Sequence, residues 1–316
     1  MLQTDWLILG ALVLDWLLGD PYDWPHPVKC MGNYITWFNS LRHRIPVSGY
    51  IFGFFLWIST VGLSVFLTWL ILEIAKSLSV YVFSIVWMYL AYTCLATKSL
   101  ALEAQKVYST LLEGTLQEAR QQVGMIVGRD TSELTSDEIV KATVETVAEN
   151  TSDGVIGPLF FLILGGPIWA IGYKAVNTLD SMVGYKTEKY REIGFVSAKM
   201  DDLLNLIPAR LTWICMLLGT CLTNLDWQSA WKIGWRDRYQ HASPNSAFSE
   251  AVVAGALGIK LGGPHIYHGQ WVEKPSIGED RRPARAKDIP ATVHLLYLTV
   301  CIFFISYLLL RFFFDF

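Results

Sequence analysis

Residues 51–75 read IFGFFLWISTVGLSVFLTWLILEIA, and this stretch decides the fold. It carries one charged side chain, Glu73, close to its end. A helix of about 20 apolar residues is long enough to cross a bilayer, so the stretch predicts a transmembrane helix. Residues 291–314 have the same character, with Arg311 near their end, and predict a second one.

Two shorter apolar stretches extend this pattern. Residues 80–97 are uncharged, and the turn-like AKSLS that precedes them predicts a hairpin with 51–75. Residues 6–18 are interrupted by Asp15, and no Lys or Arg occurs before Lys29, so the charged start of a signal peptide is missing. We therefore predict an all-α, polytopic integral membrane protein, with residues 1–316 as a single membrane domain.

Composition supports this class and narrows the partners. Of the 316 residues, 53% are hydrophobic and only 17% are charged, which is too apolar for an average soluble domain. The net charge is -3 without a strongly basic tract, which argues against nucleic acid as a partner. The five cysteines form no CxxC pair, so neither a disulfide framework nor a zinc site is indicated. A lipid bilayer is the expected partner, and an oligomer is compatible with the sequence.

Basic residues set the expected orientation. Lys29, Arg42 and Arg44 follow the first apolar stretch, and the positive-inside tendency then places residues 19–50 in the cytoplasm. The hairpin returns the chain to that side at Lys98. We expect a multi-pass protein of the cytoplasmic (inner) membrane whose cytoplasmic loops form the active site.

Two further apolar segments, 155–173 and 203–222, are interrupted by GGP and by Ile-Pro-Ala-Arg. If each crossed the membrane once, the polar blocks of the chain would lie on opposite faces. We therefore predict that both are re-entrant or buried helices, since irregular backbone at membrane depth needs shielding by protein or a cavity.

Amphipathic and polar segments complete the chain. Residues 98–128 predict one surface helix, and the capping box that starts at Thr135 predicts another, which carries two acids near its end. Residues 226–238 place three tryptophans at steps of four, typical of an interfacial helix or of a packed aromatic stripe. Residues 265–290 predict a soluble loop.

Acidic residues gather at the ends of apolar segments. Glu149 and Asp153 precede one segment, and Asp201 and Asp202 precede another. Carboxylates of this kind suit Mg²⁺, which keeps water and phosphate ligands beside them. The alternative interpretation is a solvated acidic helix end.

Cations and amides lie close to these acids in the sequence. Lys174, Asn177 and Asp180 recur at helical spacing, and Lys186 follows them. Such a cluster suits a phosphate-bearing substrate, although a membrane-proximal basic loop is a common alternative.

Three arginines and one more acid complete the candidate residues. Arg210 follows Pro208 in an apolar stretch and is expected to pair with a carboxylate or an anion, or else to snorkel at the surface. Arg236, Arg238 and Glu250 belong to the densest polar block, where guanidinium groups could hold a phosphate. The chain has no GxxxxGK[ST], GxSxG or HExxH motif, which disfavours a standard P-loop and the common hydrolase classes.

Several ordered motifs together resemble the adenosylcobinamide-phosphate synthase family of cobalamin biosynthesis, CobD/CbiB. The resemblance covers about Leu14 to Ile289. It rests on LDWLLGDPYDWPHPVKCMG (14–32), VGRDTS (127–132), VETVAENTSDGVIGPLF (144–160), YKAVNTLDSMVGYK (173–186), KMDD (199–202) and WRDRYQHASPNSAFSEA (235–251).

This resemblance implies a membrane enzyme that joins a corrin propionate carboxylate of adenosylcobyric acid to the amine of aminopropanol phosphate or a related amino alcohol. It also implies ATP as co-substrate and Mg²⁺ as cofactor. As a hypothesis, three sets of residues have separate roles in this reaction. The metal is held by Glu149, Asp153, Asp201 and Asp202. Phosphate groups of the co-substrate are bound by Lys174, Asn177, Lys186, Arg210, Arg236 and Arg238. The proton of the amine is accepted by Asp180 or Glu250.

Two other classes remain as alternatives. Broken membrane segments with buried charge are also typical of small-molecule transporters, although the chain shows no matching repeat. A non-catalytic membrane regulator would be expected to lose the acidic and basic blocks, which are intact here.

Overall fold

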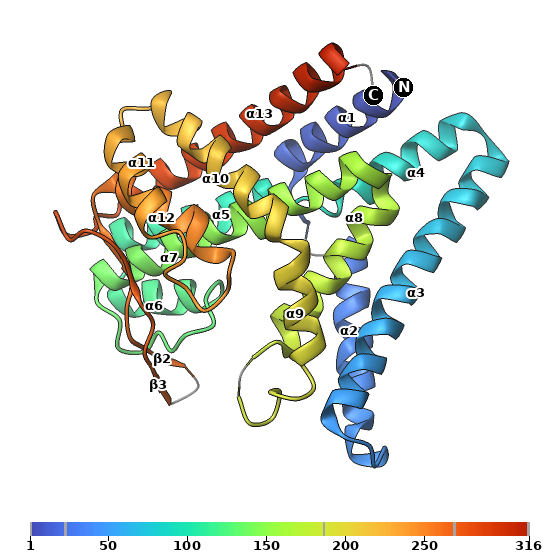
Figure 1. Ribbon diagram of the computed structural model, residues 1–316, viewed down its shortest axis with the longest axis horizontal. Helices are drawn as coiled ribbons and strands as arrows, with labels where there is room; N and C mark the ends of the chain where they lie inside the picture. The colour runs from blue at the N-terminus through green and yellow to red at the C-terminus, as the bar shows by residue number, and fades with distance from the viewer. Residues whose placement is uncertain (1, 22–23, 186, 268–269, 315–316) are drawn as a thin grey trace. The chain divides into compact units, whose positions relative to one another are not determined.

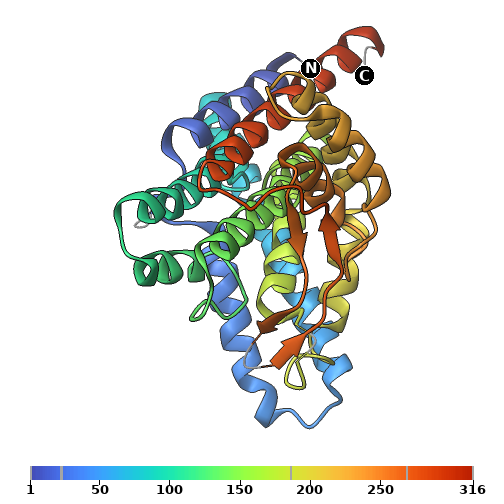
Figure 2. The ribbon, with the colours of Figure 1, turned by 90° about the vertical axis from the view of Figure 1, so that its left-hand side faces the viewer.

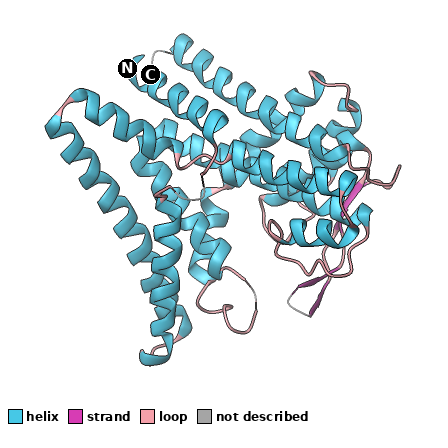
Figure 3. Cartoon of the chain, turned by 180° about the vertical axis from the view of Figure 1, so that it is seen from behind, coloured by secondary structure: helices cyan, strands magenta, loops and turns pink. Residues whose placement is uncertain are grey.

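The computed structural model describes residues 2–21, 24–185, 187–267 and 270–314. Helices dominate it, and the short strands all fall between residues 260 and 278 (Figure 3). The all-α polytopic fold is confirmed, because among the described residues four helical stretches are long and apolar enough to cross a membrane: Gly49–Leu78, Val80–Glu113, Ser136–Val183 and Asp288–Phe314. A fifth is added if the two helices that meet at Asn205 form one span.

The chain forms two compact units, each built from two separate segments. Unit 1 comprises Met1–Lys98 and Gly157–Asn205, and unit 2 comprises Ser99–Ile156 and Leu206–Phe316. The predicted spans 6–18, 51–75 and 291–314 each lie within one helix, whereas in the predicted span 80–97 the helix ends at Tyr92 and the next begins at Thr97. The placement of 155–173 and 203–222 as re-entrant or buried segments stays a prediction.

The described residues of unit 1 are helical wherever they form regular structure. A hairpin of α3 and α4 joins at Ser79, whose side chain caps the start of α4 by accepting the Val82 amide. Figure 1 shows α2 and α9 running beside α3. The elements are α1 (Leu2–Leu18), α2 (Pro27–Ser40), the 3₁₀ helix η1 (Leu41–Arg44), α3 (Gly49–Leu78), α4 (Val80–Tyr92), α8 (Gly157–Val183) and α9 (Phe195–Leu204).

The core of unit 1 lies where α2, α3 and the end of α8 meet. Ile35, Phe52, Leu56 and Leu179 are almost fully buried there. A Cβ at Gly53 would come within 2.1 Å of the Ile193 carbonyl oxygen, so only glycine permits this approach of α3 to the chain before α9. The contact holds the acid-bearing helix α9 in place.

Unit 2 packs helices around α12, in which every residue is buried. Two antiparallel strand pairs, β1 with β4 and β2 with β3, extend from this group (Figure 2). The elements are α5 (Thr97–Glu113), α6 (Leu116–Gly124), α7 (Ser136–Asn150), the π-helical turn η2 (Thr151–Ile156), α10 (Leu206–Cys221), α11 (Trp227–Arg236), α12 (Ser246–Leu257), β1 (Lys260–Gly262), β2 (His265–Tyr267), β3 (Gln270–Val272), β4 (Ser276–Gly278) and α13 (Asp288–Phe314).

The structure confirms one local prediction and corrects two. Thr135 and Glu138 form the expected capping box at the start of α7. The predicted single helix over 98–128 is wrong: the chain breaks at Gly114, and a second capping box at Thr115 starts α6. The predicted loop over 265–290 is also wrong in part, because β2, β3 and β4 lie within it and α13 begins at Asp288.

Candidate functional site

The candidate site of unit 2 is built around a buried acid on α12. Glu250 is only 5% exposed. The sequence of this helix, SAFSEAVVAGAL, consists almost entirely of small and apolar residues, which allow neighbouring helices to approach closely. A carboxyl group in such a helix is unusual, because burying an unpaired charge is costly.

Two acids from α7 lie near Glu250. Glu145 and Glu149 are four residues apart and therefore share a face of the helix. Glu149 accepts a hydrogen bond of 2.9 Å from the hydroxyl of Ser246, the first residue of α12. Glu145 accepts one of 2.6 Å from the backbone amide of Gly262 in β1. The two glutamates thus tie α7 to α12 and to the strand that follows it.

A buried cation offsets part of this negative charge. Arg129, from the connection before α7, forms an ion pair with Glu145, and both side chains are 9% exposed. Arg129 lies in the VGRDTS motif and was not predicted as a site residue. Its only signal in the sequence is a basic residue in a polar connection beside an acidic helix.

Burial raises the pKa of Glu250 well above its usual range, and the nearby Glu149 and Glu145 charges raise it further. Lys274 and Arg129 act in the opposite direction and do not outweigh these effects. A carboxyl group of this kind holds its proton to higher pH and is a stronger base once it has lost it. Such a pKa is frequent at sites of proton transfer.

Asp153 follows directly, in the π-helical turn η2, and is half-buried. In the described part of the chain, no three His, Cys, Asp or Glu side chains lie close enough together to hold a metal ion by themselves. Metal binding by the predicted carboxylates stays a prediction.

Arg210, near the start of α10, contacts the segment that leads into α12. It donates 2.6 Å and 3.4 Å hydrogen bonds to the Asn245 side-chain oxygen and the Pro244 carbonyl, and it lies 4.2 Å from the ring centre of Phe248. Its partners here are an amide, a carbonyl and an aromatic ring. Anion binding by this guanidinium stays a prediction.

The other two predicted arginines lie at the end of α11. Arg236 bonds to Asp237 and to Glu279. Burial acts to raise the pKa of Asp237, but hydrogen bonds from Arg236 and from the Gly278 amide together keep it below its usual range. Arg238 lies over the Trp235 ring at 3.9 Å. A phosphate would have to compete with these partners for Arg236.

The tryptophans of α11 are all about half exposed: Trp227, Trp231 and Trp235 are 52%, 57% and 54% accessible. Trp213 of α10 lies against two of them, with ring centres 6.0 Å and 5.8 Å apart. The stripe therefore combines packing with a large exposed aromatic surface, so both interpretations of this segment hold in part.

Unit 1 holds the second group of predicted residues in a hydrogen-bond network between α8 and α9. Asp201 is buried and accepts bonds from the side-chain amides of Asn177, at 3.2 Å, and Asn205, at 3.0 Å. Tyr173 donates to Asn205 at 2.8 Å and was not singled out from the sequence. These amides orient the Asp201 carboxylate.

Three more predicted residues of unit 1, Lys174, Asp180 and Asp202, are half-buried on the same two helices. Lys186 lies outside the described residues. The predicted residues thus form two groups, one in each unit, and their assembly into a single site stays a prediction.

Comparison with known proteins gives one consistent result. The model of a family described as "CobD/Cbib protein" matches residues 8–296. "Cobalamin biosynthesis protein CobD" of Streptococcus sanguinis is 63% identical over 97% of this chain and 98% of its own length. The protein of the same name from Listeria monocytogenes (strain EGD-e) is 53% identical over 94% and 95%. "Cobalamin biosynthesis protein CbiB" of Salmonella arizonae is 50% identical over 91% of each chain. No solved structure matches.

Proposed function

We propose that this chain, which belongs to the CobD/CbiB family, catalyses ATP-dependent amide-bond formation between a corrin propionate and an amino alcohol phosphate. Membership of the family implies a role in cobalamin biosynthesis. The proposed substrates are adenosylcobyric acid and (R)-1-amino-2-propanol O-2-phosphate or a close relative, and the product is adenosylcobinamide phosphate. The observation that carries the proposal is the group formed by the buried Glu145 and Glu250, the half-buried Glu149 and Arg129.

The chemistry requires a carboxylate to become an electrophile. In the proposed sequence, a propionate oxygen attacks the terminal phosphorus of ATP, and ADP leaves. The amine nitrogen then attacks the carbonyl carbon of the acyl phosphate, loses a proton and expels phosphate. A site for these steps needs cations beside phosphate and a base beside the amine.

Glu250 has the properties of that base. Its raised pKa makes its carboxylate more basic than an ordinary one, and its burial excludes water that would hydrolyse an acyl phosphate. Arg129 and Ser246 hold the neighbouring glutamates in position. Asp180 of unit 1 remains the alternative base.

Mg²⁺ would shield the phosphate charges of ATP. Glu149 and Asp153 offer the carboxylates for it in unit 2, and Asp201 and Asp202 are the proposed contribution of unit 1. The proposed phosphate-binding residues are Lys174, Asn177, Lys186, Arg210, Arg236 and Arg238. We place this site on the cytoplasmic side of the cell membrane.

The test combines the purified protein with adenosylcobyric acid, the amino alcohol phosphate, ATP and Mg²⁺, and follows the amide product by mass spectrometry and ADP by a coupled assay. Glu250→Gln and Asp153→Asn should lower turnover at least about 100-fold, the scale of general acid–base catalysis. Glu113→Gln, an exposed acid at the end of α5, is the matched control. Absence of product from folded protein in lipid would refute the activity, and full activity of both variants would remove these two residues from the site.

A further inference from the structure

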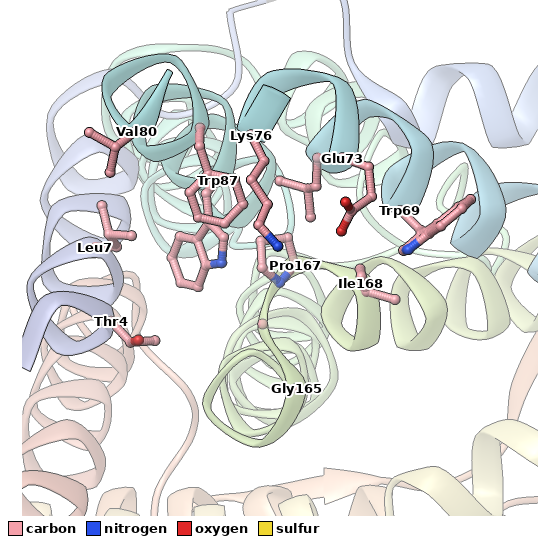
Figure 4. A pocket seen from close by; sticks show the side chains of 13 residues that line it. Thr4, Leu7, Trp69, Glu73, Lys76, Val80, Trp87, Gly165, Pro167 and Ile168 are labelled. Carbon is pink, nitrogen blue, oxygen red and sulfur yellow. The ribbon is translucent and has the colours of Figure 1, made fainter. Parts of the chain in front are cut away.

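A pocket of about 560 Å³ lies in unit 1 at the end of α3, on residues that the proposed reaction does not use. Its walls come from α1, α3, α4 and a break inside α8 (Figure 4). The lining is mainly apolar, and the side chains that bring polar groups to it are Thr4, Trp69, Glu73, Lys76 and Trp87.

The break in α8 shapes one wall. Gly166 has φ +66°, which favours glycine. An added Cβ there would lie 3.4 Å from the indole nitrogen of Trp87. Pro167 follows and cannot donate a backbone hydrogen bond. Gly166 thus permits the backbone break at which α8 lies against the indole.

Among the described residues, the two charged side chains of the pocket form no ion pair. Glu73 and Lys76 project from one turn of α3 toward Pro167 and Ile168, as Figure 4 shows. Within the described residues, no ion pair joins them to each other or to any other side chain. The Trp87 indole nitrogen lies against Gly166 in the wall of the pocket.

The position of the pocket points to a membrane ligand. It lies near the turn that joins α3 to α4, and α3 is apolar and long enough to span a bilayer. The end of such a helix is where lipid headgroups meet the protein, and tryptophan is enriched at that level. Trp69, 46% exposed, lines the pocket there.

We propose that this pocket binds a phospholipid with a zwitterionic ethanolamine headgroup. Lys76 and the Trp87 N–H bind the phosphate, Glu73 binds the ammonium, and the apolar wall takes the start of the acyl chains. A simple anion would be repelled by Glu73 and a simple cation by Lys76, whereas a zwitterion is attracted by both. A soluble amino alcohol phosphate shares the amine and phosphate, but it has no apolar part for the remaining wall.

The test measures lipid retention apart from any catalysis. The full-length protein is reconstituted with equal amounts of phosphatidylethanolamine and phosphatidylglycerol, then released from the bilayer, and bound lipids are counted by native mass spectrometry. Lys76→Gln and Glu73→Gln are compared with Lys287→Gln, an exposed lysine just before the long apolar helix α13. A thermal transition confirms that each variant is folded.

The wild type and Lys287→Gln should retain more phosphatidylethanolamine than phosphatidylglycerol. Lys76→Gln should retain about tenfold less of it, the loss expected for one charge-assisted hydrogen bond. Glu73→Gln should abolish the preference over the glycerol lipid. Equal retention of both lipids by the wild type, or unchanged retention by Lys76→Gln, would overturn the proposal. So would displacement of the lipid by soluble glycerophosphoethanolamine at matched concentration, which would identify a soluble ligand.

Discussion

Replacing Arg129 by Met tests whether the buried glutamates of unit 2 depend on one cation. The Arg129–Glu145 pair has both side chains 9% exposed, and Glu145 lies near enough to Glu250 to raise its pKa. Removing the guanidinium leaves Glu145 as a buried, unpaired charge beside two other acids. Breaking a buried pair in this way costs about 3–5 kcal/mol.

That cost should be visible as a lower unfolding temperature. For domains of 150–250 residues, each kcal/mol shifts the midpoint by about 2–4 °C, so Arg129→Met should unfold about 6–20 °C below the wild type. The assay is thermal unfolding in detergent, followed by tryptophan fluorescence. Lys106→Met removes an exposed partner of Glu103 on α5 and should cost at most about 1 kcal/mol.

A second substitution separates charge from packing. Arg129→Met combined with Glu145→Gln removes both charges of the pair, so the double variant should recover much of the loss. If Arg129→Met unfolds at the same temperature as the Lys106→Met control, the ion pair contributes little to the stability of the protein. If the double variant is no more stable than the single one, the loss arises from packing and the electrostatic reasoning is wrong.

Two further predictions concern α12. The pKa of Glu250 in the folded state lies above that in the unfolded state, so the folded state keeps the proton to higher pH and its stability should fall as pH rises above about 4.5. Glu250→Gln should remove this decline. If unfolding temperatures measured from pH 4.5 to pH 8 fall equally in the wild type and the variant, the prediction is wrong. Gly255→Ala would place a Cβ 2.5 Å from the Ser229 carbonyl oxygen, so α11 and α12 would have to move apart. Thermal unfolding should show a loss of stability of about 1–3 kcal/mol. Gly62→Ala, which has open space around it, should lose none, and equal stability of the two variants would refute the close packing.

The long apolar spans and the helix start at Thr135 could be predicted because their signals are local. A capping box needs only Thr135 and Glu138, three residues apart. The break at Gly114 is local as well, but the apolar spacing of 98–128 continues across it and masks the second capping box at Thr115. Periodicity alone therefore merged two helices into one.

The contacts that build the site depend on distant parts of the chain, and for this reason the sequence did not reveal them. Gly262 donates to Glu145 across 117 positions, and Ser246 donates to Glu149 across 97. The pairing of β1 with β4 likewise joins Lys260–Gly262 to Ser276–Gly278 across an intervening hairpin. The acids could be singled out by their type, whereas their partners follow only from the fold.

The backbone supplies an independent reason to place function at Glu149 and Asp153. The chain changes from α-helix to a π-helical turn at Thr151, between the two acids. There, side chains bond back to carbonyls one turn earlier: Asn150 to Thr146 at 3.0 Å, and Thr151 to Val147 at 2.7 Å. Such back-bonding bends helices, and π-turns are rare and frequent at functional sites. The irregular turn therefore begins between Glu149 and Asp153, and Asp153 lies within it. An irregular backbone at this point is expected where the position of the two carboxylates matters for binding.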